Sequence, residues 1–211
     1  MGARAGAPEP PVFHFASGSL CLDFANTKSW RPSRAPHERL TRFDDLVRWG
    51  EKARLLAPAQ AARLRNGGRR GRAGATALRE ARTLREALYR TFAAVADGVH
   101  ADGADAARLY AACAGLLRGS RVRARQGAFT AESAAGGRTA PGLERLVLWP
   151  VLWSAVRLLS APELASVRKC ASPDCGWLFV DGTKNGSRRW CSMSVCGNRD
   201  KVRRYRGRTG G

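Results

Sequence analysis

Four of the six cysteines of this 211-residue chain stand in two identically spaced pairs near its C-terminus. Four residues separate Cys170 from Cys175, fifteen separate Cys175 from Cys191, and four separate Cys191 from Cys196. Two short-spaced pairs across a hairpin-sized gap supply the four thiolates of a closed tetrahedral zinc site. In a reducing compartment, such clustered cysteines are metal ligands more often than disulfides. We therefore expect one Zn²⁺ per chain, bound by these four cysteines.

The residues around these pairs predict a treble-clef-like module with a knuckle, a β-hairpin and a helix. Residues 177–180 have the composition of a strand, residues 181–186 carry the glycines and asparagine of a turn, and residues 188–190 complete a second strand. Cys196 then precedes a basic segment that predicts a helix. The free N–H groups and the dipole at the start of such a helix favour a thiolate.

Few apolar residues are available to stabilise so small a module. We expect Trp177, Phe179 and Trp190 to form its core rather than to serve as stacking platforms for bases. On the predicted C-terminal helix, Val202 and Tyr205 share one side, and we expect this pair to pack against the hairpin. Two basic edges of the helix then remain free for contacts.

The charge of the chain favours a polyanionic partner such as nucleic acid. Lys and Arg number 37 against 17 Asp and Glu, which gives a formal charge of +20. Only five of the basic residues are lysine, so compositional drift toward arginine also contributes, and the placement of the charge matters more than its total. From Arg168 to the end, eleven basic residues face three aspartates, a net charge of +8. Zinc with four thiolates lowers this to about +6.

These basic residues predict contacts with the phosphates or base edges of DNA. The predicted nucleic-acid contacts are Arg188, Arg189, Asn198, Arg199, Lys201, Arg203 and Arg204. For Asn198, a local hydrogen bond in the first helical turn is the alternative to an adenine contact. For the module as a whole, the alternatives are a protein-interaction module, an inert structural staple and an RNA binder.

The chain before the cysteines predicts a mostly helical domain with a short β-hairpin. Periodicity and capping signals mark helices over 41–55, from Pro58, and over 76–97, 105–118 and 149–159. The segment after the fourth of these, "RVRARQGAFTAESAAGGRTAPGLERL", predicts a short hairpin or an irregular arm. The fold class is therefore α+β.

The segment "LCLDFANT" alternates apolar and other residues and predicts a half-buried extended stretch. Asp23 and Asn26 in this segment are candidates for lining a small-molecule pocket, while capping of a turn and the next helix is the alternative. Cys21 and Cys113 stand at apolar positions and are expected in the core.

Two stretches of this sequence resemble known families. The run "CGWLFVDGTKNGSRRWCSMSVCGNR" is similar to the CGNR zinc finger, including the Cys-Gly-Asn-Arg tetrapeptide that names it. The "LCLDFANT" segment and the helical body resemble the ABATE domain, which is described as a stress-induced transcription regulator. The resemblance implies a transcription regulator with a helical sensory or scaffolding domain and a C-terminal zinc finger. We expect a disordered arm over 1–15, the helical domain over 16–160 and the finger over 166–208.

Other sequence features argue against membrane and enzyme classes. The N-terminal sequence has no apolar core of a secretory signal, and the most apolar run is interrupted by Glu144, Arg145, Pro150 and Arg157. We therefore expect a cytoplasmic protein without a membrane partner. The sequence contains no P-loop, dinucleotide fingerprint or nucleophile elbow, and four thiolates leave zinc no open position, so no enzyme activity is expected. A homodimer is possible on this sequence, but no pattern indicates one.

Overall fold

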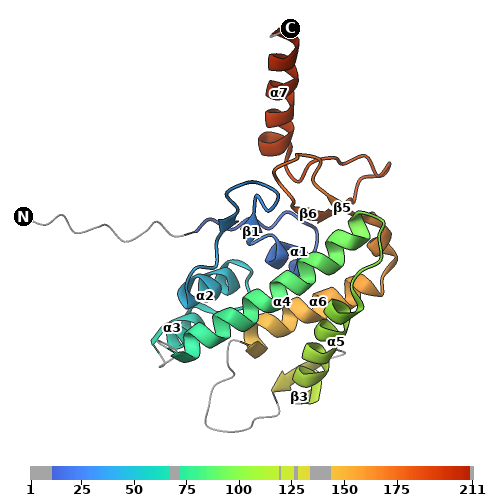
Figure 1. The fold of residues 1–211 in the computed structure, drawn as a ribbon. Helices are drawn as coiled ribbons and strands as arrows, with labels where there is room; N and C mark the ends of the chain where they lie inside the picture. Colours follow the sequence, from blue (N-terminus) through green and yellow to red (C-terminus); the bar gives the residue numbers. More distant parts are fainter. Residues whose placement is uncertain (1–10, 67–71, 119, 126–127, 134–143, 210–211) are drawn as a thin grey trace, which may run out of the picture.

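The computed structural model describes residues 11–66, 72–118, 120–125, 128–133 and 144–209, and helices make up most of this part of the chain (Figure 1). The α-helices are α1 (Leu20–Ala25), α2 (Phe43–Lys52), α3 (Pro58–Asn66), α4 (Arg72–Ala96), α5 (Gly103–Arg118), α6 (Trp149–Leu159) and α7 (Asn198–Thr209). Shorter helical turns are η1 (Glu144–Leu148), η2 (Pro162–Ser166) and η3 (Met193–Gly197). The five helices expected between residues 41 and 159 are all present.

The core of the helical body surrounds the short helix α1, which contacts both the long helix α4 and helix α6. Helix α5 packs against the same two long helices. At the centre, the rings of Phe24 in α1 and Trp49 in α2 meet edge to face, with their centroids 4.9 Å apart, and both side chains are fully buried. Burying a side chain of this size stabilises a fold by about 2–3 kcal/mol. The body is therefore organised around a segment of only six residues.

The expectation of an extended "LCLDFANT" segment is wrong, because residues 20–25 form helix α1. Cys21, Asp23 and Ala25 are buried, as Leu22 and Phe24 are. The alternation in the sequence therefore does not mark a buried and an exposed face. A short segment that is enclosed on all sides cannot be assigned to strand or helix by periodicity, and the neighbouring helices decide its conformation.

Helix α2 begins with a capping arrangement formed by Arg42 and Asp45. The carboxylate of Asp45 accepts hydrogen bonds from the backbone N–H groups of Thr41 and Arg42 at 2.9 and 2.8 Å. Asp44 instead points outward and pairs with Arg65 of α3 at 2.8 Å. The cap stabilises the helix start because it satisfies donors that have no partner inside the helix.

All strand pairs in the described residues are short and antiparallel. They are β1 (Lys28–Ser29) with β2 (His37–Glu38), β3 (Ser120–Arg125) with β4 (Ala128–Ser133), and β5 (Val167–Lys169) with β6 (Leu178–Val180). The second pair is the hairpin expected after the fourth predicted helix. Together with the helices, these pairs confirm the α+β class and the small finger that follows the helical body.

The hairpin of the finger is formed by different strands from those expected. Strand β6 pairs with β5, which lies before the first cysteine pair, while residues 188–190 form no strand. Alternate residues of a strand direct their hydrogen-bonding groups to opposite edges. At the edge of β6 away from β5, Leu178 bonds to the side chain of Asn26, and the N–H of Val180 donates to the carbonyl of Ser17 at 2.7 Å. The helical domain therefore occupies the edge at which residues 188–190 would have paired.

Residues 11–15 do not form part of a loose arm. The carbonyl of Val12 accepts a hydrogen bond from Arg39 at 3.0 Å, and the ring of Phe15 lies 5.8 Å from that of Trp49. Phe13 packs against the core of the body. These contacts hold the segment against the helical body. The rest of the expected arm, residues 1–10, lies outside the described residues.

Candidate metal centre and nucleic-acid interface

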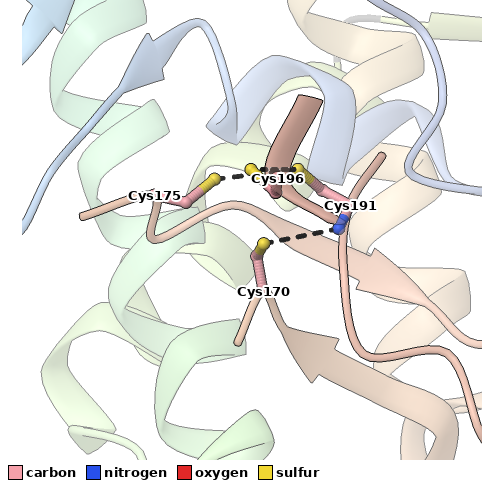
Figure 2. A group of neighbouring side chains, drawn as sticks. All are labelled: Cys170, Cys175, Cys191 and Cys196. Carbon is pink, nitrogen blue, oxygen red and sulfur yellow. Dashed lines mark hydrogen bonds between the residues drawn. The ribbon is translucent and has the colours of Figure 1, made fainter. Parts of the chain in front are cut away.

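The four paired cysteines converge on one point (Figure 2). Their sulfur atoms all lie within 4.8 Å of one another, and all four residues are buried. The Sγ of Cys191 is 3.7 Å from that of Cys175 and 3.6 Å from that of Cys196. Four thiolates at about 2.3 Å from a tetrahedral zinc ion are about 3.8 Å apart, so the spacing fits this metal. Cys170 completes the set from the end of β5.

The electrostatics of this cluster favour a bound cation. Hydrogen bonding to Cys170 and to Cys175, together with burial, raises the pKa of Cys191 well above its usual range. Hydrogen bonds from Cys175 and Cys191 lower the pKa of Cys170 to about 2. The cluster without a metal therefore favours one thiolate surrounded by thiols, because neighbouring thiolates repel one another. A four-sulfur donor set suits zinc, whose charge would stabilise all four thiolates.

The first cysteine pair is held in a turn that the helical domain covers. The backbone N–H of Cys170 donates to the carbonyl of Trp177 at 2.8 Å, which closes the turn around Cys175. Gly176 has a φ of +69°, and a Cβ at this position would lie 2.9 Å from Pro32 and 3.1 Å from the hydroxyl of Tyr89. A glycine is required here both for the left-handed conformation and for the close approach.

The second pair is positioned by a hydrogen-bonded turn at the start of η3. The carbonyl of Ser192 accepts from the N–H groups of Cys196 and Gly197 at 3.0 and 3.1 Å, and its hydroxyl accepts from the N–H of Val195 at 3.3 Å. The N–H of Cys191 points at the sulfur of Cys170, 3.4 Å away. Such N–H groups stabilise thiolates. The two pairs are thus held in mutual contact by backbone groups.

Comparison with known families agrees with this geometry. Residues 18–162 match the model of the ABATE family, described as "Putative stress-induced transcription regulator". The chain belongs to the ABATE family. Residues 166–209 of this ABATE protein match the model of the CGNR zinc finger. This matched segment contains all four clustered cysteines. No curated protein matches the chain.

Each residue of the Cys-Gly-Asn-Arg tetrapeptide has a separate contact in this ABATE protein. Cys196 belongs to the metal centre, and a Cβ on Gly197 would lie 3.0 Å from the sulfur of Met193. The side-chain amide of Asn198 donates to the carbonyl of Ser194 at 3.0 Å. Arg199 places its guanidinium over the ring of Trp30, 4.5 Å from the centroid. The tetrapeptide therefore joins the metal centre, the start of α7 and the helical domain.

Helix α7 extends away from the rest of the molecule (Figure 1). Its N-terminal end continues from η3, and residues 201–206 are all exposed. The expectation that Val202 and Tyr205 pack against the hairpin is wrong, because these side chains are 50% and 64% exposed. The hairpin lies against the helical domain, so it offers no surface to a helix that leaves the finger in the opposite direction.

The predicted nucleic-acid contacts occupy three different settings in the structure. Asn198, Arg199, Lys201, Arg203 and Arg204 belong to α7. Arg189 is exposed on the finger, with its guanidinium 5.1 Å from the ring centre of Trp190. Arg188 differs from the others, because it donates to the carbonyls of Cys191 and Ala16 at 2.7 and 3.1 Å and lies over the ring of Phe179. Arg188 therefore helps to hold the finger together.

The candidate pocket residues Asp23 and Asn26 use their polar atoms within the protein. A carboxylate oxygen of Asp23 accepts from the backbone N–H of Ser17 at 3.1 Å. The amide of Asn26 donates to the carbonyl of Leu178 at 2.8 Å and accepts from its N–H at 3.0 Å. These contacts favour a structural role for both residues. Asp23 and Asn26 line neither of the two cavities described for this chain.

The apolar core of the finger contains one residue that sequence reasoning missed. Phe179 is fully buried beside the cysteines, and Trp177 and Trp190 pack against this cluster, as expected. Trp30 of the helical domain packs against the same cluster. No spacing in the sequence links Trp30 to residues 170–196, so only the fold could identify this contact.

The backbone of Trp30 has a φ of +56°, and a positive φ in a residue other than glycine is uncommon outside turns and functional sites.

Proposed function

We propose that this ABATE protein is a zinc-dependent DNA-binding transcription regulator that acts in the cytoplasm. The single observation that carries the proposal is the placement of α7. The helix projects into solvent from the metal centre and presents Lys201, Arg203 and Arg204 as exposed residues. The matched family, described as a transcription regulator, supports the same function. The helical domain is proposed to respond to a small effector.

The dimensions of α7 suit the major groove of DNA. A helix of 12 residues is about 18 Å long, and the major groove is about 12 Å wide and admits an α-helix. Arg203 lies on one basic edge of α7, while Lys201 and Arg204 lie on another. One edge could follow the phosphates of each strand while the tip of the helix approaches the base edges.

The metal centre would hold this helix at a fixed angle to the body. Zinc would be bound by Cys170, Cys175, Cys191 and Cys196, and its role would be structural because all four positions are filled by thiolates. Cys196 lies two residues before the start of α7, so loss of the metal would release the helix from the finger. DNA binding is therefore expected to require zinc.

A second candidate function is that of a zinc-stabilised protein-interaction module. The observation that favours it is the exposure of large apolar side chains close to α7. Met193 and Val195 of η3 and Val202 of α7 are each about half exposed. Exposed apolar groups of this kind often mark contacts with another protein. Phosphate contacts weaken steeply with salt, whereas an apolar interface responds little, so ionic strength separates the two functions.

The test is selection of bound duplexes from a random pool by the zinc-loaded protein. The same selection is done with a variant in which Arg199, Lys201, Arg203 and Arg204 are changed to Gln. The matched control changes four exposed cations of the helical domain to Gln, namely Arg34, Lys52, Arg63 and Arg79. We expect an enriched motif with the wild type and the control, and none with the α7 variant.

The salt dependence of binding gives a second readout. Each DNA phosphate that α7 no longer neutralises should reduce the slope of log K against log salt concentration by about 0.9. An enriched motif that survives neutralisation of α7 would show that this helix is not the reading element. No enrichment, together with binding that is insensitive to salt, would favour the protein-interaction module. A palindromic motif would indicate that the protein binds as a dimer.

A further inference from the structure

A cavity lies between the helical domain and the finger, beside the metal centre. Its volume is about 250 Å³, and its lining consists of five residues between positions 14 and 39 and seven residues of the finger between positions 175 and 196. Three of the lining residues are the cysteines Cys175, Cys191 and Cys196. A zinc ion bound by the four sulfur atoms would take up part of this space, and the part along Trp30, Trp177 and Arg39 remains available to a ligand.

Arg39 supplies a cation to the wall of this cavity, and it has no anionic partner among the described residues. Its terminal nitrogens donate to the carbonyl of Val12 at 3.0 Å and to the hydroxyl of Ser29 at 3.4 Å. Its Nε is buried and has no hydrogen-bond partner in the described part of the chain. Burial lowers the pKa of Arg39, although a guanidinium remains charged at neutral pH. The Nε is enclosed by the protein and out of reach of a ligand, but the terminal nitrogens pair with only one carbonyl and one hydroxyl and can also donate to a carboxylate.

Aromatic side chains line the cavity beside the metal centre. Trp30 and Trp177 both line the cavity, and His14 lies 5.9 Å from Trp177, centroid to centroid. Trp30 is held in a left-handed conformation, and its carbonyl accepts from the N–H and the hydroxyl of Ser33. A backbone conformation of this kind persists only where the surrounding contacts hold it in place, and such residues cluster at functional sites. Here it places an indole ring at the boundary between the cavity and α7.

We propose that this cavity is a binding site for a small planar aromatic acid. The carboxylate of the ligand would accept hydrogen bonds from Arg39, and its ring would lie against Trp30 and Trp177. The orientation follows from charge. The zinc-thiolate group carries a formal charge of −2 and repels a carboxylate, which places the carboxylate at Arg39 and the ring toward the cysteines. The volume admits one aromatic ring with its acid group.

A ligand at this position would also contact the base of α7. Trp30 has the guanidinium of Arg199 over its ring, so the same indole borders the cavity and holds the first arginine of the proposed DNA-binding helix. This site deepens the effector response in the proposed function, but ligand binding itself does not require that α7 binds DNA. If both occur, the effect of ligand on DNA affinity and of DNA on ligand affinity must be equal.

The experiment is a titration of the zinc-loaded full chain with benzoate, followed by tryptophan fluorescence and by calorimetry, in the absence of DNA. Acetate provides the carboxylate without the ring, and benzyl alcohol provides the ring without the charge. We expect saturable binding of benzoate, and binding at least about tenfold weaker for each of the two partial probes. Arg39→Gln should weaken benzoate binding by about tenfold or more. Arg157→Gln is the matched control, because this exposed arginine lines a different cavity.

A variant that fills the cavity tests the position of the ligand without removing a charge. Val195 lines the cavity and is half exposed, so Val195→Trp can extend into it without disturbing the core. Val202→Trp on α7 is the control with the same added volume. Zinc content and thermal unfolding report whether each variant is folded. Benzoate binding that is lost in Val195→Trp and kept in Val202→Trp supports the site.

Two results would overturn the proposal. The first is the absence of saturable benzoate binding to the folded, zinc-loaded protein. The second is benzoate binding that is unchanged by both Arg39→Gln and Val195→Trp, which would place the ligand elsewhere. Because no DNA is present, either result leaves the proposed DNA binding to be judged by the duplex selection alone.

Discussion

The side chain of Asn26 forms a pair of hydrogen bonds with the backbone of Leu178, 152 residues away in the sequence. The amide donates to the carbonyl at 2.8 Å and accepts from the N–H at 3.0 Å, and both groups are buried. The edge of β6 therefore ends against a side chain of the helical domain rather than against another strand. This contact makes the finger and the helical domain structurally dependent on each other.

Replacing Asn26 should destabilise the whole protein. Asn26→Ala leaves the N–H and the carbonyl of Leu178 buried without partners, which we expect to cost about 2–4 kcal/mol of the free energy of unfolding. Asn26→Asp should cost at least as much, because a carboxylate cannot donate to the carbonyl. Urea unfolding of the zinc-loaded protein measures both changes. Asn198→Ala, which removes one exposed hydrogen bond, is the control and should cost less than about 1 kcal/mol.

Removal of zinc should loosen the helical domain as well as the finger. β6 is held by Asn26 and Ser17, so loss of the finger's structure exposes the polar groups of both residues to water. We expect a chelator or Cys191→Ser to lower the melting temperature of the entire chain. Hydrogen exchange at α1 should become faster in the metal-free protein. Unchanged protection of α1 after complete metal removal would contradict this coupling.

A side chain at Gly176, in the turn around the first cysteine pair, should lower the free energy of unfolding. Gly176→Ala places a Cβ 2.9 Å from Pro32 in addition to the cost of its positive φ. Gly186→Ala is the matched control, since Gly186 also has a positive φ but no described neighbour within 4 Å of the added Cβ. We expect a loss of about 1 kcal/mol for the control and about 2–3 kcal/mol for Gly176→Ala, measured by urea unfolding. Equal losses would show that the backbone alone requires glycine.

The ion pair between the buried Arg85 and the partly buried Glu38 should give stability that depends on pH. Burial raises the pKa of Glu38, but its two hydrogen bonds from Arg85, both at 2.6 Å, outweigh this and leave the pKa below its ordinary value. Because folding lowers the pKa of Glu38, the stabilisation from its ionised carboxylate is complete above the pKa of the unfolded chain, about 4.3. This stabilisation is lost as the pH falls through the lower pKa of the folded protein. Arg85 is almost fully buried but keeps Glu86 as a second carboxylate partner, 2.9 Å away, so Glu38→Gln at pH 7 should cost about 1–2 kcal/mol.

The measurement is urea unfolding of the wild type and of Glu38→Gln between pH 7 and pH 3. The difference between the two proteins should shrink as the pH falls, because protonation removes the same charge as the substitution. Glu80→Gln, at an exposed position of α4, should match the wild type throughout. A difference that stays constant across this range would show that the charge of Glu38 does not contribute to stability.

Exposure of the apolar side of α7 should make it insensitive to polar substitution. Val202→Ser is expected to change the free energy of unfolding by no more than about 0.5 kcal/mol, because the side chain is half exposed and is not part of the core. Ala155→Ser in the buried face of α6 is the contrasting change and should cost more than about 1 kcal/mol. Thermal and urea unfolding compare the two. A large loss for Val202→Ser would indicate packing of α7 against another surface.

Sequence reasoning succeeded where local chemistry determines structure. The spacing of Cys170, Cys175, Cys191 and Cys196 predicted a metal cluster, since thiolates can share one ion only at such spacings. Helices α4 and α6 followed from periodicity, because each has one buried face and one exposed face. Sequence reasoning failed for α1, which is enclosed on all sides and therefore shows no helical pattern.

The sequence by itself determined the four-cysteine cluster, the run of amphipathic helices and the basic composition of the C-terminal helix. Only the tertiary structure decided that β6 pairs with β5, that Asn26 covers its other edge, and that Trp30 joins the finger. These contacts link residues that are far apart in the chain, and no local propensity encodes which surfaces meet. Packing also decides the direction of α7, because the hairpin lies against the helical domain and leaves no surface for α7 to pack on.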